Sequence, residues 1–315
     1  MRHFIIFLFA LFFTQENLFS HTGGFARMGF ASRGMGMGNA ISAITNGEVY
    51  SYYNPALLPF AKEKNVSVSF SNLSFDRSLS FLSYTQNVKP SAGISIGLIN
   101  ATISNIDGRD NDGRHTKNFS TSENQFFLSF GNRFSKYFSV GTNVKIYYAK
   151  LYENITSTTV GFDFGVGIKP HKNFFISLML QDFSSKYKWN TSSIYNLNGI
   201  ETIDNFQLIK KIALSYSEEN NLYNFAIELQ NADKKNLLRS GIEFNMNENF
   251  SFRFGIDKIY LNDEYFQNKL KPSFGFSLSE KFDNYKPKLH YAYILENYSL
   301  NPIHNLTLEF ALSNK

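Results

Sequence analysis

The segment VGFDFGVGIK, residues 160–169, alternates strictly between bulky apolar residues and glycine or charged residues. Successive side chains of a β-strand point to opposite faces, so this pattern predicts a strand with one apolar and one small or polar face. The apolar face would carry Val160, Phe162, Phe164, Val166 and Ile168. A strand of this kind must place its apolar face against either a protein core or lipid.

The same two-residue alternation continues in both directions from this segment. It is clear at 138–148, at 250–257 and at 306–312, and no sustained helical periodicity appears from residue 65 onward. The full set of predicted strands, about 14 in number, is 65–73, 77–85, 90–100, 123–134, 137–149, 157–169, 173–183, 208–217, 222–230, 237–246, 250–257, 269–279, 286–296 and 304–313. The chain is therefore expected to be all-β.

Two features favour a membrane barrel over a soluble β-sandwich. Many predicted strands have the length of about 9–11 residues that crosses a bilayer at a tilt. Short connections such as 135–136 and 170–172 alternate with longer ones such as 101–122 and 184–207, as in outer-membrane barrels with short periplasmic turns. A sandwich would also alternate, but it gives no reason for an opposite face of glycine, serine and scattered charge in every strand. We predict a transmembrane antiparallel β-barrel with a narrow, wet lumen.

The amino-acid composition supports a membrane β-barrel. The chain has 34 Phe and 18 Tyr but one Trp, and it has no cysteine, which excludes disulfides and thiolate metal sites. Its net charge of +5 is spread along the chain without a basic block, so nucleic-acid binding is not expected.

The N-terminal sequence predicts a secretory signal peptide, with Arg2 before an apolar run at 4–13. That run is about half of the roughly 20 residues a membrane helix needs, which argues against an anchor. The predicted organisation is a signal peptide at 1–20, an N-terminal hatch segment at 21–64 and a barrel at 65–315. Export without a helical anchor, together with the barrel, predicts the outer membrane of a Gram-negative-type bacterium.

The hatch segment contains RGMGMGNAISAITNGEVYSYYNPALL, residues 33–58. Its glycines suggest a phosphate loop, but the third glycine of a dinucleotide fingerprint is replaced by Asn39 and no buried strand precedes it. We expect Asn39 to cap a short helix over 40–44, and a second turn over 56–58 to stop at Pro59. The segment would form a small helical plug in the lumen, with glycines that let its backbone pack against the barrel wall.

Two motifs here resemble the PorV/PorQ family of outer-membrane proteins, which are relatives of the FadL-type fatty-acid transporters. They are ASRGMGMGNA at 31–40 and YNPALL at 53–58, with weaker likenesses at 138–145, 251–255 and 290–293. The hatch residues that carry the resemblance are Arg33, Gly34, Gly36, Met37, Gly38, Asn54, Pro55 and Ala56. Leu57 departs from the family pattern, which often has glycine there.

The resemblance implies a non-enzymatic role in type IX protein secretion, with a translocon and secreted cargo as partners beside the membrane lipid. The alternative is a FadL-like channel for the uptake or export of small hydrophobic molecules. One architecture serves both roles, so the sequence leaves both open.

Charged and polar residues on the predicted lumen face are expected to pair across the interior or to form a solute-selecting constriction. They are Lys145, Asp163, Glu228, Glu243, Arg253, Asp257, His290 and Glu309. His290 is the only histidine placed within a strand, and nothing pairs the others, which fall in loops or at strand ends. A lone lumen histidine is usually a polar wall residue, so we expect no catalytic site, no cofactor and no metal.

Overall fold

The computed structural model describes residues 22–195, 198–232, 235–261, 270–282, 285–296, 299 and 301–312. The predicted signal peptide at 1–20 lies outside the described residues. None of the described helices has the length and apolar character that crossing a bilayer requires.

Short helices come first along the chain: the 3-10 helix η1 (Gly24–Arg27), the α-helix α2 (Ser32–Gly36) and the 3-10 helix η2 (Pro55–Phe60). Strands follow in the order β1 (Lys64–Leu73), β2 (Arg77–Val88), β3 (Ala92–Arg109), β4 (His115–Ser135), β5 (Phe138–Tyr152), β6 (Ile155–His171), β7 (Phe174–Phe183), β8 (Lys186–Asn190), β9 (Glu201–Asn205), β10 (Ile209–Ser217), β11 (Tyr223–Ala232), β12 (Lys235–Asn245), β13 (Phe250–Tyr260), β14 (Lys271–Ser279), β15 (Tyr285–Ile294) and β16 (Ile303–Leu312). A further short helix, α3 (Ser192–Tyr195), lies between β8 and β9.

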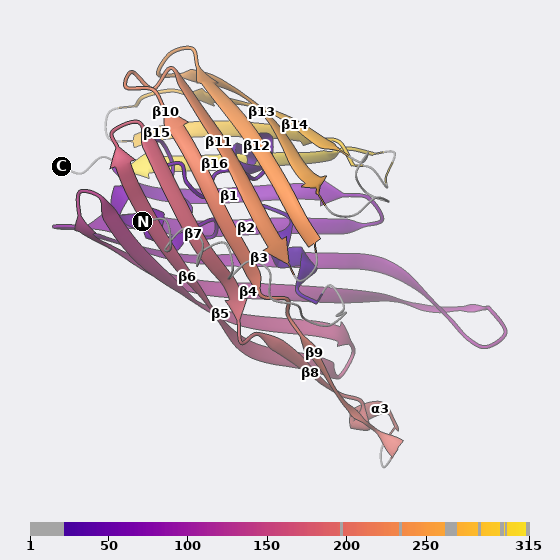
Figure 1. The fold of residues 1–315 in the computed structure, drawn as a ribbon. Helices are drawn as coiled ribbons and strands as arrows, with labels where there is room; N and C mark the ends of the chain where they lie inside the picture. The colour runs from indigo at the N-terminus through magenta and orange to yellow at the C-terminus, as the bar shows by residue number, and fades with distance from the viewer. Residues whose placement is uncertain are drawn as a thin grey trace.

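Fourteen of the strands close into one antiparallel barrel (Figure 1). Each pairs with its neighbour in sequence, β10 pairs with β7, and β1 closes the barrel against β16. This confirms the predicted closed antiparallel barrel of about 14 strands. The remaining strands, β8 and β9, form a separate two-stranded sheet inserted between β7 and β10.

The strand faces follow the predicted register. In β4, Phe126, Leu128 and Phe130 point outward with 40%, 54% and 50% exposure, whereas the intervening Phe127 and Ser129 are each 1% exposed. The same alternation turns Phe164 outward and Asp163 inward on β6. The outer surface is therefore apolar on every such strand, and the core lies inside the barrel.

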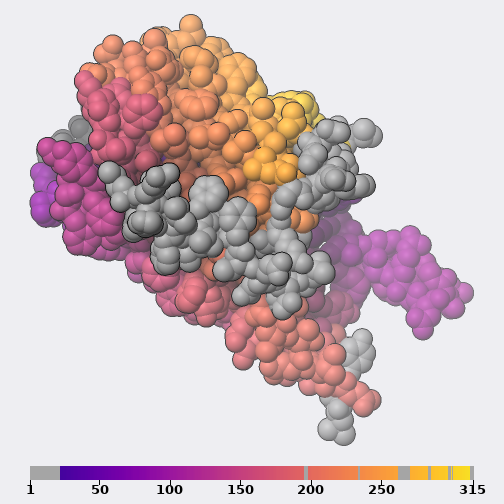
Figure 2. Space-filling view, in the orientation of Figure 1, coloured from indigo at the N-terminus to yellow at the C-terminus, as the bar shows by residue number. Residues whose placement is uncertain are grey.

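Two predicted loops contain regular structure instead. Strands β3 and β4 continue through most of 101–122 and turn only at 110–114, and the 184–207 connection holds the β8–β9 hairpin and α3. Both hairpins extend beyond the barrel body (Figures 1 and 2). In the β3–β4 extension the side chains are mostly polar on both faces, so it lacks the alternation on which the strand prediction relied, and β8 and β9 are only five residues each.

Candidate functional site in the barrel interior

The chain before β1, residues 22–63, crosses the inside of the barrel, and we call it the N-terminal segment. Helix α2 contacts β13, β14, β15 and β16, whereas η2 contacts β2 to β6. Almost every residue from 29 to 58 is buried. The segment therefore bridges two different parts of the barrel wall.

The interior contains a packed aromatic cluster instead of the wet lumen expected from the sequence. Phe30 of the segment stacks on Phe81 of β2 with ring centroids 5.6 Å apart, and it meets Tyr52 edge to face at 4.8 Å. Phe127 of β4 continues the stack from Phe81 at 6.3 Å. These inward aromatic side chains interrupt the small-residue face of the wall, and the segment supplies the apolar surface that covers them.

The helix of the glycine motif begins earlier than predicted. It spans Ser32–Gly36 and not 40–44, and Asn39 does not cap it. After Gly36 the chain takes a Schellman ending, in which Asn39 N–H donates to Gly34 O at 2.8 Å and Gly38 N–H donates to Met35 O at 3.2 Å. Gly38 occupies the position that requires the left-handed conformation, with φ of 61°.

Asn39 instead uses its side chain inside the barrel. Its amide donates to Asp257 at 3.1 Å and its carbonyl accepts from the Tyr53 hydroxyl at 2.7 Å. Burial raises the pKa of Tyr53, which keeps that hydroxyl protonated and able to donate.

Glycines mark the closest approach of the segment to the wall. A Cβ at Gly36 would lie 3.2 Å from Gly275 Cα on β14, and one at Gly38 would lie 2.6 Å from the backbone of Ile256 on β13. A Cβ at Gly34 would collide with the Tyr53 hydroxyl. Met37 is fully buried, and its backbone lies against Gly241 of β12.

Arg33 of the motif makes hydrogen bonds both to the barrel wall and within the N-terminal segment. Its guanidinium donates to both carboxylate oxygens of Glu243, at 3.0 and 2.7 Å, and to the carbonyls of Glu48 and Asn46 at 2.7 and 2.8 Å. Burial acts to lower the pKa of Arg33, but Glu243 outweighs it and the pKa is raised. Arg253 of β13 bonds the same Glu243 at 2.7 Å, so this carboxylate joins the segment to the wall.

The second motif, around Asn54, starts η2. The Asn54 side-chain oxygen Oδ1 accepts from Ala56 N–H at 2.9 Å, and Pro55 occupies the first helical position, as expected of an N-cap followed by proline. The helix runs to Phe60 and contains Pro59, so proline does not stop it where predicted. Ser139 of β5 donates to Ala56 O at 2.9 Å and fastens η2 to the wall.

Two further charge clusters flank these contacts. Lys145 lies between Asp163 and Asp182, at 2.8 and 3.0 Å, and Arg27 of η1 reaches Asp182 at 3.3 Å. Arg239 of β12 bonds Asp257 at 2.6 Å and Glu228 at 2.9 Å.

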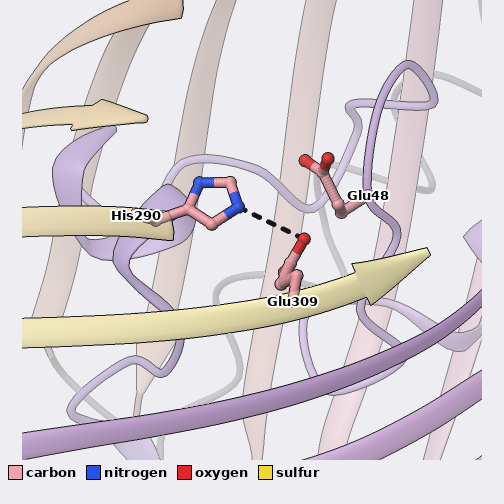
Figure 3. A group of neighbouring side chains, drawn as sticks. All are labelled: Glu48, His290 and Glu309. Carbon is pink, nitrogen blue, oxygen red and sulfur yellow. Dashed lines mark ion pairs between the residues drawn. The ribbon is translucent and has the colours of Figure 1, made fainter. Parts of the chain in front are cut away.

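The last pair of predicted residues, His290 and Glu309, lies beside a residue the sequence did not single out. His290 Nε2 is 3.2 Å from Glu309 Oε2, and Glu48 of the N-terminal segment points toward both (Figure 3). The predicted lumen residues are all buried, and they divide among three clusters: Lys145 with Asp163; Glu228 with Asp257; and Glu243, Arg253, His290 and Glu309.

Sequence reasoning missed Arg27, Glu48, Asp182, Lys211 and Arg239. Asp182 lies where the β6–β7 register shifts and has a positive φ of 64°, so the simple alternation does not assign its side to the interior. Glu48 and Arg27 lie outside any strand, where no periodicity reports which way a side chain points.

Pockets open at both ends of the packed interior. One, of about 470 Å³, lies between η1, the β8–β9 hairpin and the parts of β3 to β5 near that hairpin. It includes Phe25, Tyr187 and Trp189. Another, of about 270 Å³, lies at the end where β1 begins and β16 finishes, and includes Glu48, Lys288 and Glu309. A smaller cavity, of about 10 Å³, is lined by Tyr53, Lys211 and Arg239, among others.

No protein-family model and no curated protein sequence matches the chain. Solved structures match its fold. The CymD monoaromatic hydrocarbon channel gives a TM-score of 0.65 at 11% identity, covering 94% of this chain and 99% of that one.

The Ralstonia pickettii toluene transporter TbuX gives a TM-score of 0.64 at 10% identity, covering 91% of this chain and 99% of that one. A Pseudomonas aeruginosa FadL homologue gives 0.61 at 8% identity, covering 89% and 97%. At these identities the likeness establishes the fold, which is FadL-like.

Proposed function

We propose that this protein is a non-enzymatic outer-membrane channel for small hydrophobic molecules. The apolar outer face of a closed barrel supports the membrane location, because a closed barrel satisfies every backbone polar group in lipid. The FadL-like fold supports the class, since similar folds include proteins described as hydrocarbon channels and toluene transporters. The setting would be the outer membrane of a Gram-negative-type bacterium.

The observation that carries the proposal is the aromatic pocket beside the β8–β9 hairpin. Its volume of about 470 Å³ suits a small ligand. Trp189 donates its indole N–H to Asp204 at 2.8 Å, and Tyr187 donates its hydroxyl to Glu123 at 3.0 Å. With these polar atoms already bonded, what the two rings add to the pocket is mainly apolar surface, which favours a hydrophobic ligand.

We further propose that residues 21–64 act as a plug between this pocket and the opposite end, with residues 1–20 as a cleaved signal peptide and 65–315 as the barrel. The buried glycine contacts, the Arg33–Glu243 pair and the η2 contacts support a segment held firmly inside. The charge clusters would fix that segment and set what can pass beside it.

The single tryptophan provides a direct test, because Trp189 lines the pocket. The purified barrel in detergent is titrated with a brominated fatty acid and, separately, with toluene, while Trp189 emission is recorded. We expect saturable quenching or shift with at least one of them.

Two exposed apolar residues provide matched variants. Leu151 lines the pocket and is 53% exposed, whereas Ile200 is 66% exposed and is not among the pocket residues. Leu151→Ser should weaken ligand binding several-fold, and Ile200→Ser should leave it unchanged. A linear, non-saturating response in all three proteins would contradict the proposal.

The secretion role in the type IX system remains the second candidate, and it rests on the two motifs that resemble PorV/PorQ. Their residues fix the N-terminal segment inside the barrel, which suits either role. Affinity purification from solubilised outer membranes separates the two. Recovery of a large translocon or secreted cargo, with no saturable ligand binding, would favour secretion.

A further inference from the structure

Three potential metal ligands meet where the N-terminal segment touches strands β15 and β16. They are Glu48 of the segment, His290 of β15 and Glu309 of β16, and one ligand atom from each lies within 4.8 Å of the others (Figure 3). His290 and Glu309 are 0% and 2% exposed. Three separate parts of the chain therefore direct an imidazole nitrogen and two carboxylate oxygens at one point.

Each of these side chains has one polar atom that contacts a polar neighbour and one that makes no hydrogen bond. Glu48 Oε1 accepts from Lys288 at 2.9 Å, Glu309 Oε1 accepts from Ser67 at 3.4 Å, and His290 Nδ1 faces Arg253 at 3.3 Å. The other atom of each pair, Glu48 Oε2, His290 Nε2 and Glu309 Oε2, is buried and makes no hydrogen bond. Arg33 Nε approaches Glu48 Oε2 only to 3.7 Å. His290 Nε2 and Glu309 Oε2 face each other, and a carboxylate oxygen of Glu48 lies within 4.8 Å of them.

We propose that this cluster binds a divalent transition-metal ion such as Zn²⁺. Buried polar atoms cost free energy when unpaired, and one cation would satisfy all three. His290 Nε2 and Glu309 Oε2 are 3.2 Å apart but not aligned for a hydrogen bond. Two ligands that each lie about 2.0–2.2 Å from zinc at tetrahedral or right angles are themselves roughly 3 Å apart, which matches this spacing.

The ion would enter through the pocket of about 270 Å³, because Glu48 and Glu309 both line it. That opening also leaves a coordination position for water. Glu48 lies outside the strands, so its carboxylate can move the short distance that completes the site. One nitrogen and two oxygen ligands suit zinc and neighbouring divalent ions better than calcium or magnesium.

Neighbouring cations set the strength of binding. Arg33 and Arg253 are both bonded to Glu243, and Lys288 is bonded to Glu48. A metal on His290 Nε2 leaves the ring proton on Nδ1, so the contact with Arg253 is lost. We therefore expect moderate affinity, on the order of micromolar, and weaker than the closed four-ligand sites of structural zinc.

The ion would join the N-terminal segment to the barrel wall at the end where β16 finishes. Its binding does not depend on which molecule the barrel transports. The experiment uses the purified full barrel in detergent, stripped with EDTA and titrated with Zn²⁺ against a chromogenic chelator. Wild-type protein should bind one ion per chain, and zinc should slow amide exchange around Glu48.

Glu63 gives the matched control, because it lines the same pocket but is not among the three ligands. Glu48→Gln should weaken zinc binding at least tenfold and abolish the slowed exchange, whereas Glu63→Gln should change neither. His290→Gln removes the imidazole ligand that the barrel wall contributes, and it should abolish zinc binding in a protein that still shows heat-modifiable folding. No stoichiometric binding by the wild type, or equal affinities in the Glu48 and Glu63 variants, would overturn the proposal.

Discussion

Residue chemistry decides how closely the N-terminal segment approaches the barrel wall. Gly38 combines two requirements, because it ends α2 with a positive φ and lies where a Cβ would come within 2.6 Å of the Ile256 backbone. Backbone atoms of a strand cannot move aside as a flexible side chain can. Glycine is the residue that meets both requirements at once.

Gly38→Val should therefore loosen the segment without preventing barrel closure, because no strand pairing or outward side chain changes. The matched control is Gly24→Val, since a Cβ at Gly24 has no atom within 4 Å. We expect faster amide exchange or proteolysis across 30–50 in the Gly38 variant alone, with heat-modifiable folding retained in both. Equal protection in the two variants would show that the motif is a passive linker.

Sequence reasoning found most, but not all, of the residues that meet inside. Alternation along a strand assigns a side to each residue, which is why Lys145, Asp163 and Glu309 were expected inside. It gives no information on Glu48, which lies outside every helix and strand, or on Asp182, at a register shift. The partner of a charge is set by tertiary packing, so the alternation along the strands could not predict the Arg33–Glu243 pair.

At the scale of elements, the predicted strands agree with those observed to within a few residues wherever a strand has one apolar face. The prediction stopped short in β3 and β4, which continue to Arg109 and from His115. There most side chains on both faces are polar, and cross-strand backbone pairing and local contacts such as Arg109–Asp107 and Phe119–Tyr152 extend the hairpin. The helix expected after Asn39 failed for another reason, since the buried Asn39 amide bonds Asp257 instead of capping.

If the outer face of the barrel lies in lipid, a charge there should be costly only on the barrel strands. Phe164 of β6 and Ile203 of β9 are similarly exposed, at 47% and 49%, but Ile203 belongs to the projecting hairpin. Phe164→Arg should cost about 2–4 kcal/mol near the bilayer midplane, and Ile203→Arg close to nothing.

The measurement is the folded fraction after refolding into lipid vesicles across a urea series. Phe164→Leu serves as the control for loss of the ring. A Phe164→Arg barrel that refolds as well as wild type would argue against a lipid-facing surface at this position.

At the scale of the whole molecule, the two ends of the barrel differ. One end has the 136–137 and 172–173 turns, the start of β1 and the finish of β16, and the other has both projecting hairpins (Figure 1). Outer-membrane barrels place short turns in the periplasm and longer connections outside. We therefore expect an epitope inserted at the 110–114 turn to be labelled on intact cells, and one at the 172–173 turn to be labelled only after lysis. The opposite labelling would invert the orientation.

The proposed transport role requires the N-terminal segment to move. Within the described part of the barrel interior, the cavity lined by Tyr53, Lys211 and Arg239 holds about 10 Å³, whereas a cavity that holds benzene measures about 150 Å³. A hydrophobic molecule that crosses the interior must therefore displace packed side chains. Holding the segment in place should stop transport while leaving the barrel intact.

A disulfide supplies that restraint, because the chain has no cysteine of its own. Ser51 of the segment and Ser129 of β4 have their hydroxyl oxygens 2.9 Å apart, so Cys at both positions needs only a small shift to bond. The control is Cys at Ser251 and Ser277, whose hydroxyls also meet but which both belong to wall strands.

We expect oxidation to block uptake of a labelled hydrophobic molecule into vesicles in the Ser51/Ser129 variant, and reduction to restore it. The wall variant should transport equally in both states, because its bond restrains nothing that moves. Unchanged uptake in the oxidised Ser51/Ser129 variant, with the bond verified by mass spectrometry, would mean that the molecule does not pass by displacing this part of the segment.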